Sequence, residues 1–253
     1  MNMNQICSEN FFQEQIAKYN FAKSYCYGKT LEFSSNQFFA YHGAKILLEN
    51  KCTTIIRYYL GNKKLFKRII GDKSNIQLFK MEEDIDGLEK KSIDSIISFE
   101  TKPFGKKFKS TMQKYYEFLK DDGIVLISVL NKDVLSNSKL SNEYNDICYT
   151  KEEFHSILES IFSEVKFFSQ IKDPKNIPRT KVIGGLGVIR DSTSRILKKI
   201  DKNRSFYIKY LQSTMKKIDQ KKDEMMDRPK EDFIPIKFSS EHNPFYFIAI
   251  CKK

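Results

Sequence analysis

The residues with the clearest chemical pattern in this chain lie between Glu32 and Phe38. Read at alternate positions, the segment is acid-x-Ser-x-Asn-x-Phe, and a short apolar run precedes it. This is the outline of a strand-to-helix turn that binds nucleotides, in which glycines fill the positions held here by Ser34, Asn36 and Phe38. We therefore predict a ligand-binding loop at this point of the chain.

Strand and helix patterns alternate around this loop and predict the elements that position it. Apolar and β-branched runs predict seven strands, at 31–33, 52–60, 76–79, 92–99, 123–130, 165–169 and 244–251. Helical periodicity predicts helices at 11–27, 39–49, 106–119 and 150–162, with a turn at 120–123. This alternation indicates a doubly wound, mostly parallel α/β sheet whose final two strands form an antiparallel edge.

A helical insertion is predicted before the last strand. The α/β core takes residues 1–170 and 244–253, and the range 171–243 is basic and mostly helical. Residues 195–230 hold twelve Lys or Arg against five Asp or Glu and carry an apolar stripe at helical spacing. Such a helix could contact a protein partner, an anionic ligand or RNA, although no RNA-binding motif accompanies it. A helix packed on the core with a solvated lysine face is the simpler alternative.

The net charge of +12 favours anionic ligands, and a diffusely basic surface is the alternative. The five cysteines are odd in number and widely spaced, and no Cys-x-x-Cys pair occurs, so neither a zinc site nor a disulfide framework is indicated. We expect reduced thiols and no metal. The first twelve residues lack the apolar run of a signal peptide, and no segment has the roughly 20 apolar residues of a membrane span. These features predict a cytoplasmic protein without a membrane span.

Several segments in consistent order resemble class I S-adenosylmethionine-dependent methyltransferases. They are 21–23 before the first strand, 30–33 as that strand, 92–101 as the fourth strand, and 118–128 as a turn followed by the fifth strand. The resemblance covers about residues 15–170 and 244–253. It implies the Rossmann-like, seven-stranded methyltransferase fold with an antiparallel last strand, and S-adenosylmethionine as the cofactor.

The resemblance also implies which residues line the cofactor site. They lie in the loop after the first strand and at or just after the ends of the next three strands: Glu32, Ser34, Asn36, Phe38, Tyr58, Glu82, Glu83 and Phe99. Glu100, directly after the fourth strand, is the candidate catalytic residue, because methyl transfer needs positioning and often a base.

This chain departs from the family pattern at two places. The glycines of the first loop are absent, and Phe38 in such a space would cost about 1–3 kcal/mol by overpacking if ligand shared it. No Asp or Glu occurs between Lys51 and Gly71, so Arg57 or Tyr58 stands where the family has an acid for the ribose hydroxyls. Three functions therefore stay open: methyl transfer to a small molecule, lipid or glycan; a catalytically inactive scaffold or partner subunit; and an RNA-associated basic protein.

Overall fold

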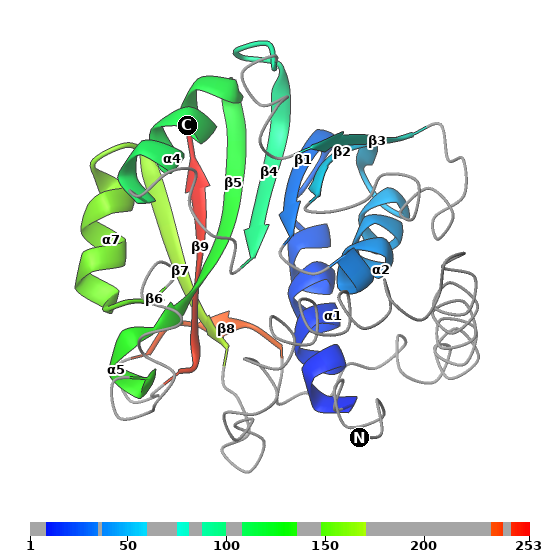
Figure 1. Ribbon diagram of the computed structural model, residues 1–253. Helices are drawn as coiled ribbons and strands as arrows, with labels where there is room; N and C mark the ends of the chain where they lie inside the picture. Colours follow the sequence, from blue (N-terminus) through cyan, green and yellow to red (C-terminus); the bar gives the residue numbers. More distant parts are fainter. Residues whose placement is uncertain are drawn as a thin grey trace, which may run out of the picture.

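The computed structural model describes residues 9–34, 37–59, 75–80, 88–99, 108–135, 148–170, 234–239 and 244–253. Within these ranges the chain forms one mixed sheet with helices on both faces (Figure 1). None of the helices in these ranges has the length and hydropathy that crossing a bilayer requires.

The strands follow the order β3-β2-β1-β4-β5-β9-β7-β8, and β6 pairs with β5 outside this path. Their bounds are β1 Gly28–Ser34, β2 Cys52–Tyr59, β3 Ile76–Lys80, β4 Ile93–Phe99, β5 Leu119–Asn131, β6 Cys148–Tyr149, β7 Glu164–Gln170, β8 Ile236–Lys237 and β9 Tyr246–Lys252. Strands β1 to β5 run parallel, and β9 lies antiparallel between β5 and β7. The predicted doubly wound sheet with an antiparallel last strand is confirmed.

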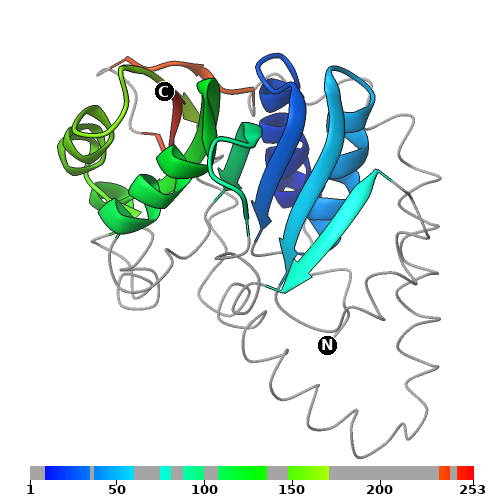
Figure 2. The same ribbon diagram turned by 90° about the horizontal axis from the view of Figure 1, so that it is seen from above.

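Helices cover the sheet in two pairs. Helices α1 (Glu9–Lys23) and α2 (Gln37–Leu48) lie on one face, while α4 (Phe108–Phe118) and α7 (Lys151–Glu159) lie on the other, as the view from above shows (Figure 2). The short helix α5 (Lys132–Leu135) follows β5 directly. Two separate apolar clusters result, one between each pair of helices and the sheet.

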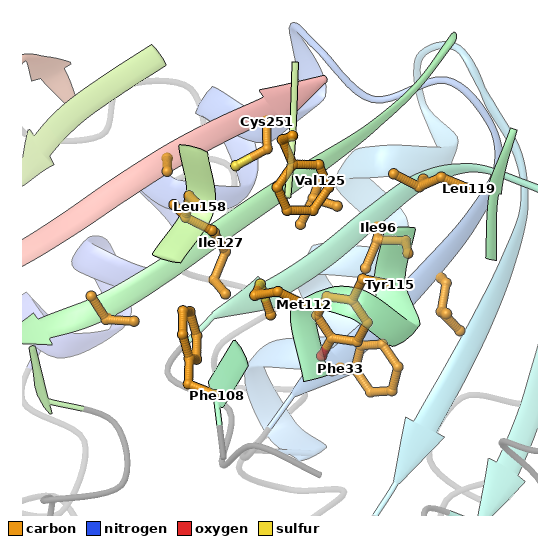
Figure 3. Close-up of a cluster of buried hydrophobic side chains, with 14 of the residues drawn as sticks. Phe33, Ile96, Phe108, Met112, Tyr115, Leu119, Val125, Ile127, Leu158 and Cys251 are labelled. Carbon is orange, nitrogen blue, oxygen red and sulfur yellow. The ribbon is translucent and has the colours of Figure 1, made fainter. Parts of the chain in front are cut away.

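The cluster under α4 and α7 is the larger one. Rings and aliphatic side chains from the helices interlock there with those of β1, β4, β5 and β9 (Figure 3). Strand β4 is buried along almost its whole length, and β9 from Tyr246 to Cys251, which explains their nearly continuous apolar sequences. Helix α7 begins with a capping box: the Glu153 amide donates to Thr150 Oγ1 at 3.2 Å, and the Thr150 amide donates to Glu153 Oε2 at 2.9 Å.

The predicted turn at 120–123 lies inside the range of β5, where the pairing register with β4 jumps from Ile93–Leu119 to Ser95–Ile124 and Gly123 comes back against Leu119 and the Lys120 carbonyl. Two predicted helix ends were wrong. Helix α1 ends at Lys23, and Gly28 begins β1 at φ +59°, where a Cβ would also overlap the carboxyl group of Asp94. Helix α7 ends at Glu159 instead of 162.

The predicted insertion 171–243 lies outside the described residues except for 234–239. Within that stretch, Ile236 and Lys237 form β8 and pair with Ser169 and Phe168 of β7. The two-residue strands β6 and β8 were not predicted from the sequence. The helical and basic character of 195–230 stays a prediction.

Candidate functional site at the carboxyl edge of the sheet

The sheet changes its winding direction between β1 and β4. From β1 the strand order runs outward through β2 and β3, and from β4 it runs the opposite way through β5. The carboxyl ends of β1 and β4 lie side by side, with Ser34 paired to Phe99. In open α/β sheets, ligands bind outside the carboxyl ends of the strands at such a switch point. The predicted loop after Glu32 begins here.

Glu32 is the charged side chain that β1 brings to this point. It is fully buried and points to the α1 face of the sheet, where the hydroxyl of Tyr19 donates a hydrogen bond to its Oε1 atom. Removing a carboxylate from water is costly unless hydrogen-bond donors meet it. The Tyr19 hydroxyl supplies such a donor from α1.

The ring of Tyr19 is held by two neighbours. It meets the ring of Phe99 edge-on, with 5.4 Å between ring centroids and an interplanar angle of 73°. Gly43 of α2 also lies against it, so closely that a Cβ there would overlap the Tyr19 ring. A helical glycine costs about 1 kcal/mol relative to alanine. Gly43 allows α1 and α2 to pack closely, and this packing holds the Tyr19 ring in the position from which its hydroxyl reaches Glu32.

On the opposite face of the sheet, which α4 covers, the side chains near the carboxyl ends of β1 and β4 belong to the hydrophobic core. The ring of Phe33 stacks on Tyr115 of α4 at 4.9 Å between centroids, and both residues lie together in Figure 3. Tyr115 donates to Ser98 Oγ at 3.2 Å, and burial raises its pKa well above the ordinary value for tyrosine. Among the described side chains, the α4 side is therefore mostly apolar, with the Tyr115–Ser98 pair as its hydrogen-bonded exception, and the buried carboxylate of Glu32 lies on the α1 side.

The remaining predicted site residues are placed as follows. Phe99 is the last residue of β4 and is buried against Tyr19. Ser34 ends β1, and Tyr58 of β2 pairs with Phe33, so the backbone brings both to the same edge as Glu32. The side chains of Ser34 and Tyr58 lie outside the description.

The other candidates are described in their backbone alone or lie outside the described residues. Phe38 is the second residue of α2, and its ring lies outside the description. Asn36, Glu82, Glu83 and Glu100 also lie outside the described residues. Their roles remain predictions.

The N-terminal half of α1 adds a buried polar cluster that the sequence analysis missed. Its side chains at Gln13, Glu14, Gln15 and Lys18 are all at least nine-tenths buried. In Figure 1, α1 continues past the arrowheads of β1 and β4, so this part of the helix lies at the carboxyl edge. The C-terminal half of α1 packs on the apolar part of the sheet.

Two strands anchor this polar half of α1. The Lys18 Nζ atom lies 3.5 Å from the ring centroid of Tyr246, the first residue of β9. The Tyr246 hydroxyl donates to Glu14 Oε2 at 3.4 Å, and Gln170 Nε2 at the end of β7 donates to the Glu14 carbonyl at 3.0 Å. Because Lys18 and Tyr19 are adjacent, one helix joins this anchor to the carboxylate of Glu32.

Two signals for this cluster existed in the sequence. Glu14 and Lys18 are four residues apart, a spacing that is also typical of a solvated ion pair on a helix surface. Gly43 interrupts an otherwise good helical segment, which indicates close packing. Neither signal identifies Tyr19 as the partner of Glu32. Among the described residues, no group of three or more His, Cys, Asp or Glu is arranged to hold a metal ion.

No protein-family model and no curated protein sequence matches this chain. Several solved structures do match. A SAM-dependent methyltransferase of Thermotoga maritima, described as a possible histamine N-methyltransferase, is 12% identical, with a TM-score of 0.56 over 99% of this chain and 92% of that one. Phosphoethanolamine N-methyltransferase 2 of Haemonchus contortus, in complex with S-adenosyl-L-methionine, is 15% identical, with a TM-score of 0.51 over 98% of this chain and 55% of that one.

A third similar structure has a different activity in its name. The [4+2]-cyclase SpnF is 10% identical, with a TM-score of 0.51 over 95% of this chain and 80% of that one. At identities this low, the likeness establishes the fold and nothing finer. The chain has the class I S-adenosylmethionine-dependent methyltransferase-like fold.

Proposed function

We propose that this protein binds S-adenosylmethionine at the carboxyl edge of its sheet and transfers a methyl group to a small molecule, lipid or glycan. The observation that carries the proposal is the position of Glu32. A buried carboxylate with a dedicated hydrogen-bond donor lies at the end of β1, beside the switch point of the methyltransferase-like sheet. The matching solved structures include methyltransferases, one of them with this cofactor bound.

Two features of the described residues support S-adenosylmethionine as the ligand in the first part of the site. The ends of β1 and β4 are adjacent, and the acid that the family pattern requires is present as Glu32. The cofactor would supply a methyl group on a sulfonium centre. Around it, we assign Glu32, Ser34, Asn36 and Phe38 to the first loop.

The other assigned cofactor contacts come from the following strands. Tyr58 belongs to the end of β2, Glu82 and Glu83 to the segment after β3, and Phe99 to the end of β4. In the family pattern an acidic residue in the second-strand region binds the ribose hydroxyls. This chain has no Asp or Glu between Lys51 and Gly71, so other groups would have to bind those hydroxyls.

Glu100 is the candidate general base for the acceptor. It directly follows Phe99, the last residue of β4, at the edge where the ligand would bind. Its part would be to accept a proton from an oxygen or nitrogen acceptor while neighbouring residues align that acceptor. Replacing Glu100 by Gln should lower methyl transfer without weakening cofactor binding.

A second function is supported by specific observations. Glu32 has no exposed surface, and the acid that would bind ribose is missing from the second strand. These features favour a catalytically inactive, methyltransferase-like scaffold or partner subunit. In that case the Tyr19–Glu32 pair would serve only to join α1 to the sheet.

Calorimetric titration separates the two functions. We expect micromolar binding of S-adenosylmethionine and of its demethylated product, abolished by Glu32→Ala. The matched control is Glu164→Ala, which removes an exposed carboxylate that pairs with Lys166 at the start of β7. This variant should bind like the wild type. No heat of binding at millimolar cofactor would refute the proposed enzyme and favour the scaffold.

A further inference from the structure

We propose that Tyr19 is a positioning residue of this site: its hydroxyl fixes the Glu32 carboxylate in the orientation that ligand binding requires. The inference rests on the proposed function, because it concerns the same cofactor site. It adds a residue from outside the family motifs, on a helix that precedes the first strand.

The surroundings of Tyr19 support a positioning role. Its side chain is almost completely buried, and its ring contacts Phe99 and the backbone of α2 at Gly43. A tyrosine has two side-chain torsions, and close packing of the ring leaves its hydroxyl little freedom. The donor that reaches Glu32 is therefore held rigidly, as a residue that orients a functional group must be.

Packing alone would not require this pair. Phenylalanine and an aliphatic residue at positions 19 and 32 would cover the same apolar surface without burying a carboxylate. The ring of Tyr19 already has apolar neighbours in the cluster under α1 and α2. The hydroxyl and the carboxylate are thus the parts that packing does not explain, and both lie at the strand ends where a ligand would bind.

The first test compares two tyrosines that each lose a buried hydroxyl. Tyr19→Phe keeps the ring and removes the donor to Glu32, whereas Tyr115→Phe removes the donor to Ser98 on the opposite face. Affinity for S-adenosylmethionine and for its demethylated product is measured by calorimetry, and unfolding by urea is measured in parallel. We expect about tenfold weaker binding for Tyr19→Phe, and less than a twofold change for Tyr115→Phe.

A double-mutant cycle then shows whether Tyr19 acts through Glu32. Glu32→Gln is combined with Tyr19→Phe, and the four affinities are compared. If Tyr19 positions the carboxylate, the double variant should bind no more weakly than Glu32→Gln alone. A purely structural role would instead give additive losses that follow the loss of stability.

Each outcome decides the proposal. Unchanged affinity in Tyr19→Phe, with binding still abolished by Glu32→Ala, would overturn the positioning role and leave the proposed function intact. Additive losses in the cycle would do the same. A wild-type protein that binds no cofactor at millimolar concentration would overturn both. Non-additive loss, together with an unaffected Tyr115→Phe, would support the role of Tyr19.

Discussion

The ammonium group of Lys18 lies 3.5 Å from the ring centroid of Tyr246, and both side chains are buried. The pair joins α1 to β9 at the carboxyl edge, where β9 borders the end of β5. The Tyr246 hydroxyl also meets Glu14, so one tyrosine contacts both Glu14 and Lys18. A buried cation gains more from an aromatic ring than an exposed one, because water does not compete for it.

This arrangement predicts a graded loss of stability at Tyr246. Tyr246→Phe removes only the hydroxyl and should lower the free energy of unfolding by about 1 kcal/mol. Tyr246→Leu also removes the ring under Lys18 and should cost about 2 kcal/mol more. Urea denaturation followed by circular dichroism measures both effects.

Tyr116 provides the matched control for that series. Lys253 Nζ lies 4.5 Å from its ring centroid in an exposed setting. Tyr116→Leu should therefore cost no more than about 1 kcal/mol. Equal losses at Tyr116 and Tyr246 would show that burial does not strengthen the contact with Lys18.

The contact between α1 and α2 predicts that Gly43→Ala is destabilising. The added methyl group would overlap the Tyr19 ring, which cannot move away without leaving Glu32 and Phe99. Overpacking of about 1–3 kcal/mol should outweigh the roughly 1 kcal/mol that alanine gains in a helix. The free energy of unfolding from urea titration gives the net loss.

Two further variants test the cause of that loss. At Gly123 a Cβ would lie 2.9 Å from Leu119 Cδ2, a methyl group that can rotate away, and 3.0 Å from the Lys120 carbonyl oxygen, so Gly123→Ala should cost less. In a Tyr19→Leu background the penalty of Gly43→Ala should shrink, because the ring is gone. A penalty that persists there would mean that another neighbour opposes the methyl group.

The capping box of α7 predicts a dependence of stability on pH. The Thr150 backbone amide and then the Lys132 ammonium lower the pKa of Glu153 below its ordinary value of 4.5. Because the folded-state pKa is the lower one, this contribution is fully present above the unfolded value. It is lost as pH falls through the folded value. Urea midpoints measured from pH 6 to pH 3 should fall more steeply in the wild type than in Glu153→Gln.

The control for this profile is Glu152→Gln. It removes a carboxylate from the same exposed helical turn but leaves the contacts of Glu153 with Thr150 and Lys132 in place. Its profile should keep the steep acid limb of the wild type. If the urea midpoint of Glu152→Gln fell less steeply with pH than that of the wild type, the cause would be the total negative charge of the first helical turn and not the capping box.

The sequence was sufficient to predict the sheet because its central strands are buried on both faces. Strands such as β4 and β9 then carry apolar runs that few other structures produce. Glu32 could be placed at a strand end from its pattern alone. The pairing of Leu119 with Ile93, by contrast, comes before the turn at 120–123, and no local sequence pattern predicts it.

The contacts of α1 could not be predicted for a related reason. Glu14 and Lys18 have the spacing of a solvent-exposed pair, but both are buried and contact Tyr246 of β9, which lies more than 220 positions away in sequence. The Tyr19–Glu32 contact joins residues 13 positions apart through a helix, a turn and a strand. Such contacts are decided by the packing of whole elements, which residue periodicity does not encode.

The position of β9 has a consequence for how this chain folds. Asn131 and Pro244, whose side-chain-to-backbone bond closes the β5–β9 junction, are 113 positions apart in sequence. Until that distance is closed, β5 and β7 each present an unpaired edge, and the apolar surface beneath them is incomplete. Contacts of such high sequence separation form slowly. We therefore expect the β5–β9–β7 part of the sheet to form late, and aggregation to compete with folding at the edges of β5 and β7 until then.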